Sequence, residues 1–77
     1  MAQEIVERIE KDIRMFHDSV GKLRALELSE RERDVVDLAE DYCKDAGSWL
    51  AKGDYYTSFA SVSYAHGLLD ALLKIRS

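Results

Sequence analysis

The C-terminal third of the sequence constrains the fold most, because it is nearly free of charge in a chain that is 34% charged. Between Tyr55 and Leu73, Asp70 is the only charged residue. A helix that is apolar or small on almost every side is usually buried by neighbours on more than one side. We therefore predict that residues 55–75 form a central helix and that two more highly charged helices pack against it.

Two amphipathic segments precede this stretch. Residues 3–26 are predicted to form a helix, because their apolar side chains recur at steps of three and four. A capping box, in which Ser29 caps a helix and Glu32 reaches back to the Ser29 amide, predicts a second helix over residues 30–51. The predicted inner face of the first helix comprises Ile5, Ile9, Ile13, Phe16, Val20 and Leu23. That of the second comprises Val35, Leu38, Ala39, Tyr42, Ala46, Trp49 and Leu50.

Three glycines interrupt or end the predicted helices. At Gly21, inside the first predicted helix, either a neighbouring helix passes close or the helix loosens before Leu28. At Gly47, inside the second, we expect a neighbouring helix to approach closely. Gly53 suits the left-handed residue that follows a helix end, and Asp54 suits the N-cap of the next helix. So short a connection makes the third helix antiparallel to the second. The sequence thus predicts an all-α fold: one domain, residues 1–77, forming a three-helix antiparallel up-down-up bundle.

Composition excludes several kinds of function. Cys43 is the only cysteine, which rules out an internal disulfide, and one cysteine with two histidines cannot supply a classical zinc finger. The net charge of −4 argues against nucleic-acid binding, which needs a basic face. No apolar run approaches the roughly 18–20 residues of a membrane span, and residues 1–10 are too acidic for a signal peptide. We expect a cytoplasmic protein that binds no nucleic acid, membrane, cofactor or metal. The weakest alternative is RNA binding by a strip of Lys11, Arg14, Lys22 and Arg24.

The run from Gly53 to Leu72 resembles a known family. Its Gly-Asp-Tyr-Tyr opening, the pair Phe59-Ala60 and the segment Ser63-Tyr64-Ala65-His66-Gly67-Leu68-Leu69-Asp70-Ala71-Leu72 are similar to the signature of a small archaeal family, domain of unknown function 357. The resemblance implies a cytoplasmic archaeal protein and a closed bundle with a left-handed twist. Spectrin repeats and immunoglobulin- and albumin-binding domains have this form. The resemblance implies no reaction, cofactor or ligand.

One face of the predicted third helix is small and weakly polar where a solvated face would normally be charged. On a helical wheel it consists of Tyr56, Ala60, Ser63 and Gly67. Small residues let another helix approach closely, and an exposed tyrosine is a typical interface anchor. We interpret this face as a non-enzymatic interaction surface, whose partner is another protein or a second copy in a homodimer.

The alternative hypothesis is a small-ligand or metal-assisted enzymatic role centred on His66 and Asp70. These residues are four apart and can touch on one helix face, where the carboxylate would orient the imidazole for proton transfer, with Tyr64 nearby. The simpler interpretation is a structural hydrogen-bonded pair at the edge of the core, since no nucleophile accompanies it. The acidic runs Glu4, Glu7, Glu10 and Asp34, Asp37, Glu40 are interpreted as solvated faces and not as a magnesium site.

Overall fold

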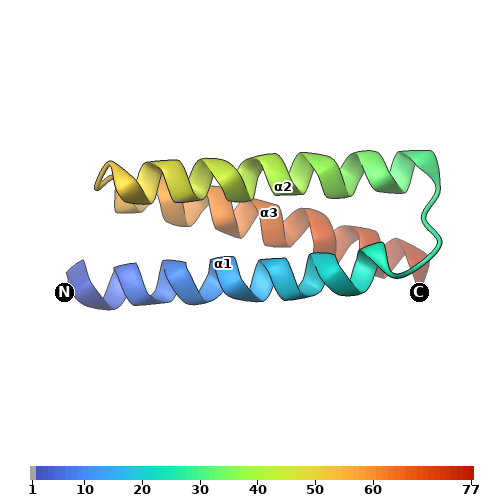
Figure 1. Cartoon of the computed structure of the whole chain (residues 1–77), viewed down its shortest axis with the longest axis horizontal. Coiled ribbons are helices and arrows are strands. Elements are labelled where there is room, and N and C mark those ends of the chain that lie inside the picture. Colours follow the sequence, from blue (N-terminus) through green and yellow to red (C-terminus); the bar gives the residue numbers. More distant parts are fainter. Residues whose placement is uncertain (1) are drawn as a thin grey trace.

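The computed structural model describes residues 2–77 and contains three helices (Figure 1). They are α1 (Ala2–Arg24), α2 (Glu30–Ala51) and α3 (Tyr55–Arg76). The helices run up, down and up in a bundle of 40 × 17 × 16 Å, so that the first turn of α1 and the last turn of α3 lie at opposite ends. The all-α three-helix bundle is confirmed, although α1 ends two residues earlier than predicted. The left-handed twist stays a prediction.

The predicted helix ends are formed by the residues expected to form them. The Ser29 hydroxyl accepts a hydrogen bond from the Glu32 amide at 3.1 Å, and the Glu32 carboxylate accepts one from the Ser29 amide at 2.8 Å. Gly53 has a φ of +81°, in the left-handed region. Asp54 then caps α3, because its carboxylate accepts a hydrogen bond from the Thr57 amide at 3.1 Å and one from the Thr57 hydroxyl at 2.8 Å. Interactions between residues close in sequence therefore determine both connections between the helices.

The core lies along the common axis of the three helices, and its membership corrects one prediction. The buried apolar residues are Ile9, Phe16, Val20 and Leu23 of α1, Val36, Ala39, Cys43 and Ala46 of α2, and Val62, Ala65, Leu69 and Leu72 of α3. On α2 the predicted inner face was wrong for Leu38 and Trp49, which are 45% and 37% exposed. The reason is that α2 is rotated about its own axis relative to the predicted orientation. Its buried side includes Val36 and Cys43, and Leu38 and Trp49 therefore lie to one side of the core.

The helices α2 and α3 pack most closely, while α1 stands further from α2 (Figure 1). Ser58 of α3 is fully buried, and its hydroxyl donates a hydrogen bond of 2.6 Å to the backbone carbonyl of Ala46 in α2. The predicted close approach at Gly47 is wrong, because a Cβ atom added there would meet nothing within 4 Å. The same holds at Gly21, where α1 instead ends three residues later, before Leu28. Close packing depends instead on the buried Ser58 and on alanines in the facing seams.

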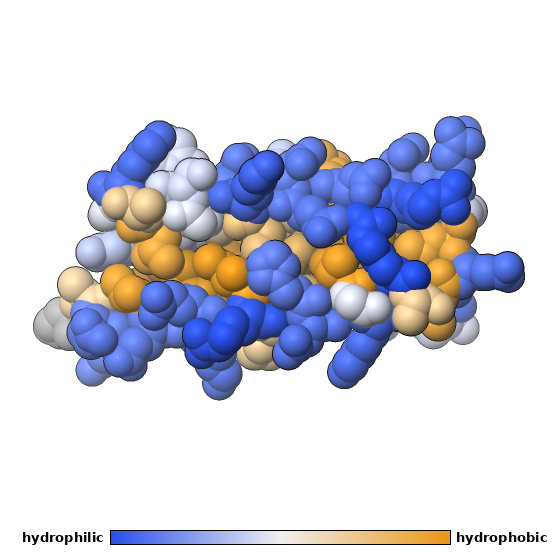
Figure 2. Space-filling view, in the orientation of Figure 1, coloured by the Kyte–Doolittle hydropathy of each residue, from blue (hydrophilic) through white to orange (hydrophobic). Residues whose placement is uncertain are grey.

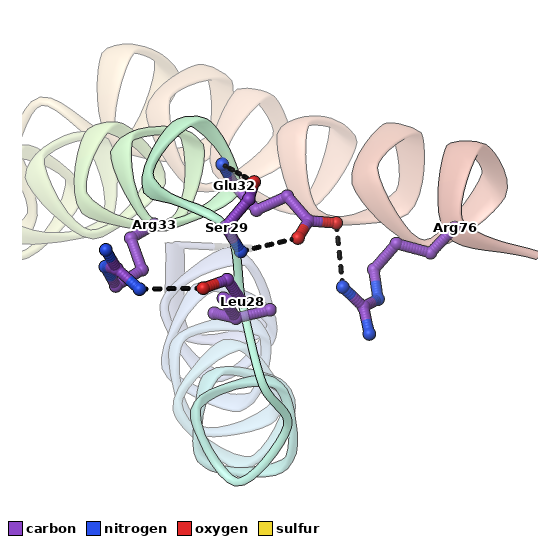
Figure 3. A network of polar contacts seen from close by, with 5 residues as sticks. All are labelled: Leu28, Ser29, Glu32, Arg33 and Arg76. Atoms are coloured by element: carbon purple, nitrogen blue, oxygen red, sulfur yellow. Dashed lines mark hydrogen bonds and ion pairs between the residues drawn. The ribbon is translucent and has the colours of Figure 1, made fainter.

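The capping box of α2 also holds the end of α3. In Figure 3 the Arg76 guanidinium points at the carboxylate of Glu32, and the two form an ion pair of 2.7 Å. The same figure shows Arg33 donating to the Leu28 carbonyl, also at 2.7 Å. The hydrogen bond from the Ser29 amide and that from Arg76 together lower the pKa of the Glu32 carboxyl. One carboxylate thus joins the α1–α2 connection, the start of α2 and the end of α3.

This carboxylate predicts a loss of stability in acid. The pKa of Glu32 is lower in the folded chain than in the unfolded chain, where it is about 4.3. The contribution of Glu32 to the free energy of unfolding is therefore complete above this pH and is lost as the pH falls further. Glu32→Gln keeps an acceptor for the Ser29 amide but removes the charge. We expect the variant to be less stable than the wild type at neutral pH and the difference to shrink near pH 3, as measured by urea unfolding. Glu27→Gln, in the same connection, is the control. If the difference in unfolding free energy between the wild type and Glu32→Gln did not change with pH, the proposed role of the Glu32 charge would be contradicted.

Candidate interaction surface

The outer face of α3 is exposed as predicted. Tyr56 is 92% exposed, and Ala60, Ser63 and Gly67 are exposed along the helix beyond it. A Cβ atom added to Gly67 would meet nothing within 4 Å, so no neighbouring element covers this part of the face. Ser58 and Val62, on the opposite side of the helix, are fully buried. The four residues therefore form an uncharged, open face, while its role in binding stays a prediction.

Aromatic and apolar side chains of α2 continue this face across the α2–α3 contact. Tyr42 of α2 meets Tyr64 of α3 edge to face, with ring centroids 4.5 Å apart, and Tyr64 is 52% exposed. Leu38 and Trp49 lie on the same side of α2 as Tyr42. The Lys52 ammonium lies 4.9 Å from the centroid of the Trp49 ring. Sequence reasoning missed this part of the surface because it placed both residues in the core. The signal was present in the sequence, since α2 carries two adjacent apolar strips and only one of them can face the core.

His66 is held by α1 and not by Asp70. Its Nε2 atom lies 2.8 Å from the Asp12 carbonyl oxygen, and its ring packs edge to face on Phe16, with the centroids 5.7 Å apart. Because a carbonyl oxygen only accepts, Nε2 carries the proton. Asp70 is exposed, and within residues 2–77 no hydrogen bond joins it to His66. The imidazole therefore ties α3 to α1, as a structural side chain at the edge of the core does.

The surroundings of His66 form an open depression between α1 and α3, lined mainly by charged and polar side chains. Its lining includes the Arg8–Asp12 ion pair, whose N–O distance is 3.2 Å. Arg8 also lies over the ring of Phe59, 5.6 Å from its centroid. Of the polar groups that line it, Arg8 and Asp12 pair with each other and His66 is bound to a backbone carbonyl. Within residues 2–77 the other polar side chains of the lining, those of Asp70, Ser19 and Ser63, form no such pair. Because the imidazole is bound to α1 and is not paired with Asp70, the His66–Asp70 arrangement of the enzymatic alternative is not formed, and we pursue the interaction surface.

The other candidates for chemistry have structural roles in the described chain. No group of three or more histidine, cysteine or acidic side chains within residues 2–77 is arranged to hold a metal ion. In the acidic run of α2, Asp37 and Glu40 both pair with Arg24 of α1, the first at 2.7 Å. Cys43 is 3% exposed, and burial, with the nearby charge of Glu40, raises the pKa of its thiol. From Ala2 to Ser77, no helix is both long and apolar enough to cross a membrane.

A second apolar region lies in the groove between α1 and α2. Figure 2 shows apolar side chains along the middle of the molecule, between the two front helices. Ile13 and Cys43 line part of this groove, but charged side chains make up half of the lining there: Asp37, Glu40, Asp41 and Lys44. The outer face of α3 carries no such charges between Tyr55 and Leu69, and it is therefore the better candidate for an interaction surface.

Comparison with known proteins identifies the chain at the level of a family. A family model described as "Protein of unknown function (DUF357)" matches residues 11–76, which is most of the chain. No curated protein matches the sequence.

Proposed function

The chain belongs to the DUF357 family, and we propose that it is a non-enzymatic interaction module that associates with a second copy of itself through the outer face of α3. The description of the family assigns no activity, so the proposal depends on the surface. The observation that carries it is Tyr56, a large aromatic side chain left 92% exposed on an uncharged face. Burying such a side chain against a partner is worth about 1.5–3 kcal/mol.

The composition of the face favours a second copy as the partner. In a twofold-symmetric dimer the same patch meets itself, so a charge near the symmetry axis would face its own copy. The chain carries a net charge of −4, but the part of α3 from Tyr56 to Gly67 carries none. Two copies can therefore approach along this face without direct repulsion. Ala60, Ser63 and Gly67 allow the two helices to approach closely, and each copy contributes one Tyr56 as an anchor.

Sedimentation equilibrium from low to high micromolar concentration tests the proposal. We expect the wild type to dimerise and Tyr56→Arg to raise the dissociation constant by about tenfold or more, because two cationic side chains would enter the interface. The matched control is Ile75→Arg. Ile75 is also exposed on α3, at 83%, but lies about 100° around the helix from Tyr56.

Two results would contradict self-association through this face. One is a wild type that remains a monomer at high micromolar concentration. The other is a wild-type dimer whose dissociation constant is the same for Tyr56→Arg as for Ile75→Arg. Circular dichroism of each variant confirms that the helices are retained.

A further inference from the structure

The side of α2 next to the α3 face holds apolar side chains that the fold leaves uncovered. Leu38, Tyr42 and Trp49 follow one another at steps of four and seven, which places them on one side of the helix. The Tyr42–Tyr64 contact, with centroids 4.5 Å apart, shows that this side borders α3. Leu38 is 45% and Trp49 37% exposed. We use the name hairpin surface for the outer face of α2 and α3 that comprises Leu38, Tyr42, Trp49, Tyr56, Ala60 and Tyr64.

The size of this surface bears on whether a dimer would be stable. A helix of 22 residues is about 33 Å long and about 10 Å wide, so α3 alone offers a footprint of roughly 330 Å². A standard interface buries about 800 Å² on each partner. The outer faces of α2 and α3 together offer roughly 650 Å², since packed helices lie about 10 Å apart. The outer face of α3 therefore offers less than half of a standard interface, and the two-helix hairpin comes closer to one.

We propose that the self-association surface spans both helices of the α2–α3 hairpin, so that Leu38 and Trp49 of one copy are covered by the second copy. This inference rests on the proposed function and extends it to α2. Aromatic side chains dominate the hairpin surface, as they dominate the centres of protein interfaces. It also accounts for Leu38 and Trp49, the two residues with a core-like sequence pattern that the bundle leaves partly exposed.

Acidic residues within and beside the hairpin surface give the dimer a distinct salt response. Asp45 is exposed on the same side of α2 as Leu38 and Trp49, seven residues after the first and four before the second. Asp41 is exposed next to this side, and the chain has a net charge of −4. A dimer brings two chains of the same negative charge together, and salt screens their repulsion. We therefore expect association to strengthen as the salt concentration rises. A complex with a basic partner would weaken instead.

Trp49 is the only tryptophan of the chain, so its fluorescence reports directly on this part of the surface. For the wild type, we expect the emission to shift to shorter wavelength and acrylamide quenching to fall over the concentrations at which sedimentation shows dimers. Leu38→Arg is expected to weaken the dimer by about tenfold or more. The control is Leu26→Arg, since Leu26 is 47% exposed in the α1–α2 connection, away from the hairpin surface.

The outcomes separate this inference from the proposed function. If Tyr56→Arg weakens the dimer while Leu38→Arg does not, and the quenching of Trp49 is independent of concentration, the interface is confined to α3. The extension to α2 is then overturned and the proposed function stands. If the wild type remains a monomer at all concentrations, both are overturned. Concentration-dependent burial of Trp49 together with a weakened Leu38→Arg dimer supports the two-helix surface.

Discussion

Replacing Phe16 by alanine is expected to lower the free energy of unfolding by about 3–5 kcal/mol. Phe16 is fully buried and is the largest side chain that α1 contributes to the core. Its ring packs edge to face on His66 of α3, at 5.7 Å, so the substitution opens a cavity where α1 meets α3. At the usual stability per residue, a folded chain of 77 residues has a free energy of unfolding of roughly 4–12 kcal/mol, of which this loss is a large part.

The matched control for Phe16→Ala is Met15→Ala, one residue earlier in α1. Met15 is 49% exposed, and its truncation is expected to cost well under half as much. Urea unfolding followed by circular dichroism measures both variants. Equal losses of unfolding free energy in Phe16→Ala and Met15→Ala would mean that α1 does not pack against α3 through Phe16. Such a result would also place the hydrogen bond between His66 and the Asp12 carbonyl in question, since the same helix contact positions it.

The parts of the fold that the sequence predicted are those encoded by neighbouring residues. The capping box of Ser29 and Glu32, the left-handed Gly53 and the Asp54 cap each act within four residues. The apolar pattern of α1 was equally readable, because a single narrow strip is flanked by charge. These features fixed the number, direction and bounds of the helices to within two residues.

The features that the sequence did not predict depend on contacts between helices. On α2 two apolar strips adjoin, and only the packing against α1 and α3 decides that Cys43 is inside and Trp49 outside. His66 was predicted to contact Asp70 because the two are four apart, but its partner is a backbone carbonyl 54 residues away. In the candidate site, the exposure of Tyr56 followed from its wheel position. The neighbouring strip of α2 could not be assigned until the rotation of that helix was known.

The rotation of α2 itself has a physical cause in the size of the residues that face α3. Ala39 and Ala46 of α2 and Ala65 of α3 are fully buried, and small side chains in facing seams let two helices lie close together. The Ser58 hydroxyl reaches the Ala46 carbonyl at 2.6 Å, so a side chain of only two heavy atoms spans the gap to the backbone of α2. Bulky Leu38 and Trp49 would not fit such a seam, and they lie beside it.

Ser58→Leu is therefore expected to lower the free energy of unfolding by about 1.5–4.5 kcal/mol. The lost hydrogen bond contributes about 0.5–1.5 kcal/mol, and forcing a larger side chain into a packed seam contributes about 1–3 kcal/mol. Ser58→Ala separates the two effects, since it removes only the hydrogen bond, and the Ala46 carbonyl keeps its partner within α2.

The control is Ser48→Leu, at an exposed position of α2. Urea unfolding of the three variants tests the close contact: equal losses for Ser58→Leu and Ser58→Ala would show that the seam has room for a larger residue. In that case the small residues would not explain why α2 turns Trp49 outward.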